Sequence, residues 1–377
     1  METLRWIGLD VHAETIAVAV AERNGEVRGV GVIPNRPESV RKLMKKLGPP
    51  STVRACYEAG PTGYGLYWQL TALGVPCEVV APTLIPVKPG DRVKTDRRDA
   101  MKLARCYRAG DLTAVWVPDA AHEALRDLVR AREAAKKDEL RARHRLSKFL
   151  LRRGCRPPQP MKSWTKPYLA WLRHGVHFDA AAQAATYQDY LHEVDHMAER
   201  LTRLDQAIDT AIAAAPPQIR AVFEALQALR GIARVAAASL VAELGQISRF
   251  PRASQLMGYS GLSPREDSSG ARVRRGSITK TGNAHVRRMV TEAAWSYRHR
   301  PLVATVLRRR QTLVSAEVRA ISWKAQTRLH ARYRLLTGRG KCHQRVVTAV
   351  ARELLGFIWA IGVSVERSQT TTLSSAA

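Results

Sequence analysis

Four acidic residues stand where their carboxylates could act together, in a chain that is otherwise short of acids. Asp10 ends the first apolar run, Glu58 ends the run VRACYE, and Asp96 and Asp99 open the segment TDRRDAMKLARCYRAG. Because Asp96 and Asp99 are three residues apart at the start of a predicted helix, both lie on one helix face. A sheet that brings the two strand ends beside this helix would gather all four carboxylates.

Such a cluster repels itself and favours a divalent cation. Hard oxygen ligands select Mg²⁺ or Mn²⁺ over zinc, and two such ions about 3.5–4 Å apart can activate a nucleophile at a phosphodiester. Spacing alone leaves a second interpretation open. Asp96 could interact only with the positive end of its helix, and Asp99 only with a neighbouring arginine. Asp10 and Glu58 could be ordinary residues at strand ends.

A second reactive group could lie in the dipeptide Ser269-Gly270, preceded by Ser268. A serine hydroxyl needs a partner that removes or stabilises its proton, and no histidine triad is readable nearby, so a polar turn is the simpler interpretation of these residues alone. The surrounding cations could contact phosphates without reading a base sequence, or form a solvated basic surface. They are Arg265, Arg272, Arg274, Arg275, Lys280, Arg287 and Arg288.

The first third of the chain contains the elements that would position the carboxylates. Short apolar runs alternate with helix-forming segments, and Asn24-Gly25 between two of the runs is a strong hairpin signal. Three strands in hairpin order, followed by alternating strands and helices, predict a mixed sheet with helices on its faces. We expect this α/β domain to span residues 1–120.

The rest of the chain is expected to be mainly helical. Residues 121–153 are basic and helix-forming, and the prolines of residues 154–180 predict an irregular connection. From Leu191 to Ile212, apolar residues recur at spacings near three, four and seven, which predicts a coiled-coil-like helix. This helix could pack within the chain or against another copy. The expected regions are a helical middle at 121–217, a C-terminal domain at 218–366 and a polar tail at 367–377.

The charge of the chain indicates a polyanionic partner. Its 377 residues contain 61 Lys and Arg against 33 Asp and Glu, a formal net charge of +28, which favours nucleic acid or an anionic membrane. We expect no membrane-spanning helix, because the late apolar stretch LLGFIWAIGVSV is well short of the roughly 20 residues required. Arg5 and Asp10 likewise interrupt any signal-peptide core.

Three further patterns predict no functional site. The five cysteines, Cys56, Cys77, Cys106, Cys155 and Cys342, form no CxxC pair, so a reduced, cytosolic protein is expected. The sequence His192-Glu193-Val194-Asp195-His196 matches a zinc-protease pattern, but its histidines fall on the polar side of the predicted amphipathic helix. The glycines 60, 63 and 65 follow GxxGxG spacing and not the dinucleotide fingerprint.

Three segments in order, WIGLDVH, CYEAGPTGYG and KTDRRDAMKLA, closely resemble the DEDD transposases of bacterial insertion sequences. This resemblance implies a RuvC-like, RNase H-type nuclease domain at the start of the chain. The four acidic positions of the family match Asp10, Glu58, Asp96 and Asp99, and the family binds Mg²⁺ (or Mn²⁺) through them. The resemblance thus favours the metal cluster over the alternative interpretation.

The segment GLSPREDSSGARVRRGSITKTGNAHVRRMVTEAA is similar to the C-terminal domain of the same family. The nucleophilic serine of the family precedes a glycine, which matches Ser269, with Ser268 as a neighbouring rival. The resemblance implies activation by the metal-bound carboxylates and a phosphoserine link to DNA that permits rejoining without ATP. The segment LRGIARVAAASLVAELG resembles a helix-hairpin-helix element, although Gly231-Ile232-Ala233 replaces the usual Gly-Ile-Gly and weakens its phosphate site.

The resemblance therefore predicts a transposase that excises and inserts its own mobile element. It implies donor and target DNA as substrates, guidance by a structured RNA, and a homo-oligomer, a tetramer, with shared active sites in the bacterial cytoplasm at the nucleoid. Two alternatives remain open. One is a metal-dependent junction-resolving nuclease that uses water, and the other is a catalytically silent nucleic-acid-binding protein.

Overall fold

The computed structural model describes residues 4–87, 90 and 93–375, with side chains up to residue 369. The chain forms two compact units, Met1–Val117 and Pro118–Ala377. These are called the N-terminal unit and the C-terminal unit below, and each is described by itself.

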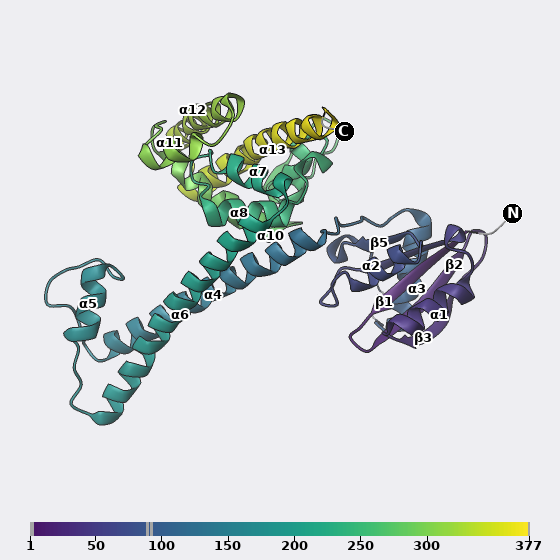
Figure 1. Ribbon diagram of the computed structural model, residues 1–377, viewed down its shortest axis with the longest axis horizontal. Helices are drawn as coiled ribbons and strands as arrows, with labels where there is room; N and C mark the ends of the chain where they lie inside the picture. The colour runs from purple at the N-terminus through teal and green to yellow at the C-terminus, as the bar shows by residue number, and fades with distance from the viewer. Residues whose placement is uncertain (1–3, 88–89, 91–92, 376–377) are drawn as a thin grey trace. The chain divides into compact units, whose positions relative to one another are not determined.

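The N-terminal unit contains the mixed five-stranded sheet that the sequence predicts, with strand order β3-β2-β1-β4-β5 (Figure 1). Strands β1, β2 and β3 pair antiparallel, and β1, β4 and β5 pair parallel. The central position of β1 brings its end beside the end of β4. The strands are β1 (Arg5–Val11), β2 (Thr15–Glu22), β3 (Val27–Pro34), β4 (Val53–Glu58) and β5 (Cys77–Val80).

Helices cover both faces of this sheet, as the alternation of its residues requires. On one face, Ile7 and Leu9 of β1 are buried in a cluster with residues of α1 (Pro37–Leu47) and α2 (Gly65–Ala72). On the other face, the alanines of β2 pack against α3 (Asp96–Ala109). Small side chains on this second face let the backbone of α3 approach the sheet closely.

The C-terminal unit is mainly helical, which completes the expected layout of an α/β region followed by an α region. Its two short strands, β6 (Pro264–Glu266) and β7 (Arg275–Ile278), form a hairpin. Its helices are α4 (Ala120–Arg152), α5 (Lys166–His174), α6 (Ala181–Ala214), α7 (Pro217–Leu226), α8 (Arg234–Leu244), α9 (Ala253–Tyr259), α10 (Ala284–Ala294), α11 (Thr305–Gln311), α12 (Ala316–Gly338) and α13 (His343–Ser375). Short 3-10 turns occur at Pro50–Thr52, Pro82–Leu84, Ile247–Arg249 and Trp295–Arg298.

The coiled-coil-like helix packs within the chain. Helices α4 and α6 lie side by side over much of their length (Figure 1). Leu191 and Val194 of α6 are buried in a cluster with apolar residues of α4 and α5. An ion pair joins Arg132 Nε to Asp205 Oδ1 at 2.8 Å across the two helices. The apolar seam that sequence periodicity reveals is therefore occupied by this chain and gives no separate support to self-association.

The expectation of an irregular connection at 154–180 was wrong in one respect, because helix α5 lies inside it. Pro167 stands in the first turn of α5, where proline is favoured and where it removes no intrahelical hydrogen bond. Tyr168 and Leu172 of α5 are buried against α4 and α6. Burial of this apolar face explains a helix that the proline content alone does not predict.

The C-terminal helix α13 is longer than the apolar stretch within it suggests. Its part His343–Gln369 is 27 residues, long and apolar enough by length and composition to cross a membrane. More than half of the most apolar part is buried inside the protein, and Leu354, Leu355 and Ile358 lie fully in the main core. The burial of these residues makes α13 a core helix of the C-terminal unit. It continues to Ser375 through most of the segment expected as a polar tail, of which residues 376–377 lie outside the described residues.

Candidate functional site

The first two carboxylates follow from the register of two parallel strands. Leu9 of β1 pairs with Tyr57 of β4, so the next residues along the strands are Asp10 and Glu58. Because side chains alternate along a strand, Glu58 shares the face of Cys56, whose Sγ lies 3.8 Å from the carbonyl oxygen of Leu103 in α3. Asp10 and Glu58 therefore lie at one edge of the sheet, on the face that α3 covers.

The other two carboxylates come from the first turn of α3, which a glycine allows to lie against β1. A Cβ atom on Gly8 would lie 2.2 Å from the carbonyl oxygen of Ala100 and 2.4 Å from the backbone nitrogen of Ala104. Only glycine permits this approach. The helix begins after Thr95, whose hydroxyl accepts a hydrogen bond from the backbone N–H of Arg98, and its first turn carries the acidic pair.

The local charges favour a cation at this edge. Burial raises the pKa of the Asp10 carboxyl above its ordinary value, while nearby His12 lowers it and the neighbouring Asp99 and Asp96 raise it. The side chain of Asp10 is only 18% exposed, compared with 61% for Asp96. Negative groups brought together and partly desolvated are stabilised in the ionised form by a divalent metal, for which carboxylate oxygens are suitable ligands.

His12 completes this group and was missed in the sequence. Its Nε2 lies 3.4 Å from Asp10 Oδ2 and 3.5 Å from Asp96 Oδ1, and one ligand atom from each of the three residues falls within 4.8 Å of the others. The sequence holds a signal for this residue, because His12 follows Asp10 by only two residues, just past the end of β1 at Val11. No other such group of three metal-binding side chains occurs in the part of the chain that the structure describes.

Glu58 and Asp99 line one pocket of about 290 Å³ in the same unit. Lys94 and Lys102 also line it, and Lys94 Nζ is 3.9 Å from Asp99 Oδ2. The side chain of Lys94 is 87% exposed, so this contact is weak and easily displaced by a stronger cation. The four predicted carboxylates thus divide into two neighbouring sets, Asp10 with Asp96 and Glu58 with Asp99.

Ser269 lies at the tip of the β6–β7 hairpin in the C-terminal unit. Its backbone N–H and C=O both bond to Arg272 at 3.1 Å, and Gly270 makes the turn with a φ of +54°. Ser268 uses its hydroxyl locally, donating to Glu266 Oε1 and accepting from the Arg274 N–H, each at 3.1 Å. Ser269 is exposed, and its Oγ has no hydrogen-bond partner among the described residues.

The predicted basic residues fall into two groups. Five are exposed on or beside the hairpin, namely Arg265, Arg272, Arg274, Arg275 and Lys280. Arg287 instead donates from Nη1 to the carbonyl oxygens of Ser260, at 2.8 Å, and Thr281, at 3.1 Å. Arg288 forms ion pairs with Glu133 at 2.8 Å and Glu292 at 3.1 Å. Both of these arginines are partly buried and bind groups of the same chain.

The turn that resembles a helix-hairpin-helix element joins α7 and α8. Gly231 has a φ of +85°, and a Cβ atom there would lie 2.4 Å from the carbonyl oxygen of Ala293. Arg310 Nη1 donates to the carbonyl oxygen of Ile232 at 2.7 Å. The glycine thus serves the packing of the turn against α10, while Ala233 stands at the cap position of α8.

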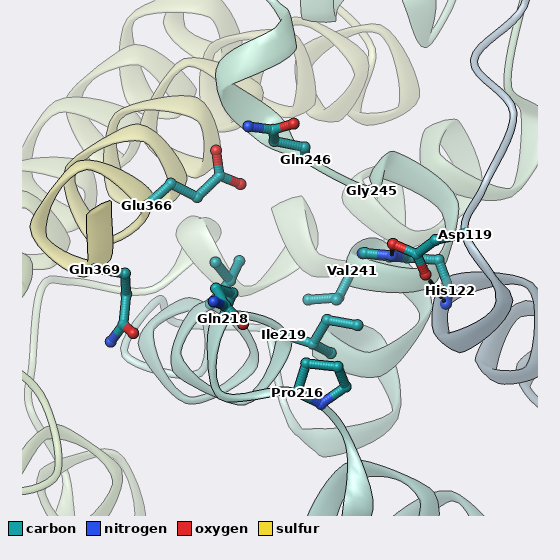
Figure 2. A pocket seen from close by; sticks show the side chains of 11 residues that line it. Asp119, His122, Pro216, Gln218, Ile219, Val241, Gly245, Gln246, Glu366 and Gln369 are labelled. Atoms are coloured by element: carbon teal, nitrogen blue, oxygen red, sulfur yellow. Dashed lines mark hydrogen bonds and ion pairs between the residues drawn. The ribbon is translucent and has the colours of Figure 1, made fainter. Parts of the chain in front are cut away.

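A separate pocket of about 300 Å³ lies inside the C-terminal unit (Figure 2). Asp119 and His122 lie on one side of it, with Asp119 Oδ2 and His122 Nδ1 2.8 Å apart. On another side, the carboxylate of Glu366 accepts the backbone N–H groups of Ile247 and Ser248, each at 2.7 Å. The carboxylates in this pocket are already hydrogen-bonded by the protein, so they serve as caps.

Comparison with known proteins identifies the chain at the level of its family. Residues 223–308 match a family described as Transposase IS116/IS110/IS902 family, and residues 7–153 match the DEDD transposase domain of the IS110 type. The y4qE protein of Sinorhizobium fredii, which is named as a transposase, is 47% identical over 97% of this chain and 90% of its own length. The transposase for insertion sequence element IS1533 of Leptospira borgpetersenii is 32% identical over 89% of this chain and 97% of its own length.

The chain belongs to the IS116/IS110/IS902 family of transposases. It is therefore a DNA transposase, as the segments around the four carboxylates predicted. The DEDD domain of this transposase contains Asp10, Glu58, Asp96 and Asp99, and such a domain implies the use of divalent metal. Ser269 lies in the matched region 223–308.

Proposed function

We propose that this transposase cuts and rejoins DNA through a covalent bond to Ser269, with Mg²⁺ or Mn²⁺ held by Asp10, Glu58, Asp96 and Asp99. The observation that carries the proposal is the gathering of these carboxylates at the edge of the sheet, where Asp10 and Asp96 have oxygens within 4.8 Å of each other. When bound, the metal would neutralise charge on the attacked phosphate and favour the ionised nucleophile. His12 would orient or extend the same ligand set.

The serine step conserves the number of phosphodiester bonds. The Ser269 Oγ–H loses its proton, Oγ forms a bond to phosphorus, and the bond from phosphorus to one strand oxygen breaks, with that oxygen taking up a proton. The hydroxyl of an incoming strand then attacks the same phosphorus and releases the serine. Because each bond broken is matched by one formed, strand exchange needs no ATP.

The hairpin geometry supports Ser269 as the nucleophile over Ser268. A nucleophilic oxygen must be accessible and free to approach phosphorus, and Ser269 meets this condition at the turn. The Ser268 oxygen is engaged by Glu266 and by the Arg274 backbone and fixes the shape of the hairpin. We assign Ser268 a positioning role, and Arg265, Arg272, Arg274, Arg275 and Lys280 contacts with the phosphates around the attacked bond.

The proposal includes the partners that such a reaction requires. The net charge of +28 supports a long polyanionic ligand, which we assign to donor and target DNA together with a structured guide RNA. The carboxylates and the serine lie in different units of the chain, and both must act at one phosphodiester. We propose that they meet at shared sites in a homo-oligomer, a tetramer, in the cytoplasm, which is the assembly that the resemblance of the sequence implies.

A cleavage assay with matched variants tests this function against its rivals. Donor and target DNA, RNA transcribed from the flanks of the element and Mg²⁺ would be incubated with the wild type, Asp10→Asn, Ser269→Ala and Ser268→Ala. We expect strand exchange to vanish in Asp10→Asn and Ser269→Ala and to persist at a reduced rate in Ser268→Ala. Normal cleavage by Ser269→Ala would indicate a water-using nuclease instead. Binding without cleavage in every protein, with an active relative as positive control, would indicate a silent nucleic-acid-binding protein.

A further inference from the structure

A groove of about 1030 Å³ lies in the C-terminal unit between the β6–β7 hairpin and the helices α12 and α13. Part of its floor is apolar, formed by Leu262, Ile278 and Ala349, which pack against or belong to the main core of the unit. The groove is distinct from the carboxylate cluster, which belongs to the other unit. Its floor is part of a firmly packed core and can serve as a fixed base for a ligand.

The walls of the groove are strongly basic. Of the described residues that line it, seven are Lys or Arg and one, Glu353, is acidic. Glu353 is shared by two cations of α12, Arg328 at 3.0 Å and Arg332 at 3.1 Å. The excess of positive charge therefore remains after the internal ion pairs are counted.

Three other cations that line the groove have no ion-pair partner in the part of the chain that the structure describes. Lys341, just before α13, and Arg345 and Arg352 of α13 are exposed and form no ion pair among the described residues. Like charges along one wall repel each other, and an anionic ligand removes this repulsion. A row of such cations matches the repeated phosphates of a nucleic-acid strand better than a single small anion.

The groove is continuous with the hairpin that carries Ser269. Arg275 of β7 lines the groove, and its Nε lies 3.5 Å from Glu266 Oε2. The other oxygen of Glu266 accepts the hydroxyl of Ser268, at 3.1 Å. One carboxylate thus connects Arg275, in the wall of the groove, to Ser268, the residue next to Ser269.

We propose that this groove binds the sugar-phosphate backbone of the DNA strand that Ser269 attacks, with phosphates on its cationic walls and sugars over its apolar floor. This assignment rests on the proposed serine chemistry for the choice of DNA. Among the described residues, those that line the groove include no aromatic side chain, so base stacking is not expected to hold the strand there. The groove holds the strand in place irrespective of its base sequence.

A binding measurement on full-length protein tests the groove without requiring catalysis. In an Asp10→Asn background, Lys341→Gln, Arg345→Gln and Arg352→Gln would be combined and compared with a triple variant of three exposed arginines outside the groove, Arg308→Gln, Arg309→Gln and Arg334→Gln. The probe is a short fluorescent single-stranded DNA of mixed sequence, followed by anisotropy at several salt concentrations. Thermal unfolding of each variant confirms that it folds.

We expect the groove variant to bind DNA at least about tenfold more weakly and to lower the salt slope by about two, since each of the three lost phosphate contacts on single-stranded DNA accounts for a slope of about 0.7. The control variant should keep most of the affinity. Equal losses in both variants, or loss of RNA binding with DNA binding intact, would overturn the assignment. If the groove variant loses DNA while Ser269→Ala still cleaves normally, the serine chemistry fails and DNA binding by the groove stands.

Discussion

A Cβ atom placed on Gly8 would lie 2.2 Å from the carbonyl oxygen of Ala100, far inside van der Waals contact. This relationship between the central strand and α3 is what allows Asp96 and Asp99 to stand beside Asp10. The DEDD cluster therefore depends on a residue that carries no functional group, and this dependence can be measured.

We expect Gly8→Ala to destabilise the N-terminal unit by about 2 kcal/mol or more, because α3 must move away from the sheet to accept the methyl group. The affinity of the Gly8→Ala variant for divalent metal should fall together with its stability. Gly65→Ala is the matched control, since nothing lies within 4 Å of its Cβ and it stands in helix α2, where alanine is favoured. Urea unfolding followed by circular dichroism measures both, and equal stability of the two variants would contradict the packing argument.

His12 is predicted to contribute to metal binding through its contacts with Asp10 and Asp96. We expect His12→Gln to weaken Mn²⁺ binding by about tenfold to a hundredfold, the usual effect of losing a ligand or its orienting partner, and Asp10→Asn to abolish it. Isothermal titration of the purified protein with Mn²⁺ measures this without DNA. Undiminished affinity in His12→Gln would remove the residue from the site, and undiminished affinity in Asp10→Asn would remove the site itself.

The partly buried Glu133 links α4 to α10 and gives a pH-dependent contribution to stability. Hydrogen bonds from Lys137, His285 and Arg288 lower its pKa from 4.5 to about 2, against the opposing effect of burial. Because the pKa is depressed in the folded state, the contribution is present above pH 4.5 and is lost as the pH falls toward 2.

We therefore expect wild type to exceed Glu133→Gln in stability by about 1–2 kcal/mol near pH 5. The difference should shrink as the pH is lowered, since Lys137 and Arg288 stay charged and only the carboxylate titrates. Urea unfolding midpoints of both proteins over this range provide the test. A difference that does not change with pH would show that Glu133 contributes by packing alone.

Arg287 has a structural role, whereas Arg274 is proposed to contact phosphate. Variants of these two arginines should therefore differ in their effects. Arg287→Gln loses two hydrogen bonds to backbone carbonyls, so we expect a loss of stability of about 1–3 kcal/mol with little change in the salt slope of DNA binding. Arg274→Gln should leave stability within about 0.5 kcal/mol and lower the salt slope by about one. The opposite pattern in unfolding and anisotropy measurements would reverse the two roles.

The strands and the strand-end carboxylates could be predicted because their signals are local. Asn24-Gly25 marks the turn between β2 and β3, and strand alternation places Asp10 on a defined face. The contact between Gly8 and Ala100 could not be predicted, because it depends on which helix covers which face. His12 lies just past the end of β1, where strand alternation no longer fixes the direction of a side chain.

Other features depend on partners that leave no pattern in the sequence. The apolar series from Leu191 predicts a helix and a seam, but periodicity does not say whether the partner is α4 or another copy. Arg287 looks like its exposed neighbours, since a backbone carbonyl as hydrogen-bond acceptor has no sequence signature. The proline content of residues 154–180 does not predict helix α5, because proline breaks a helix interior, whereas Pro167 occupies the first turn, where proline is tolerated.

The most direct test of the account is the identity of the residue that becomes joined to DNA. End-labelled DNA, the flanking RNA and Mg²⁺ would be incubated with the transposase, the reaction stopped with denaturant, and the protein digested for mass spectrometry. We expect a nucleotide attached through phosphate to Ser269, absent from Ser269→Ala and Asp10→Asn and retained in Ser268→Ala. A nucleotide on another residue, or cleaved DNA with no protein adduct, would contradict serine-mediated recombination by this hairpin.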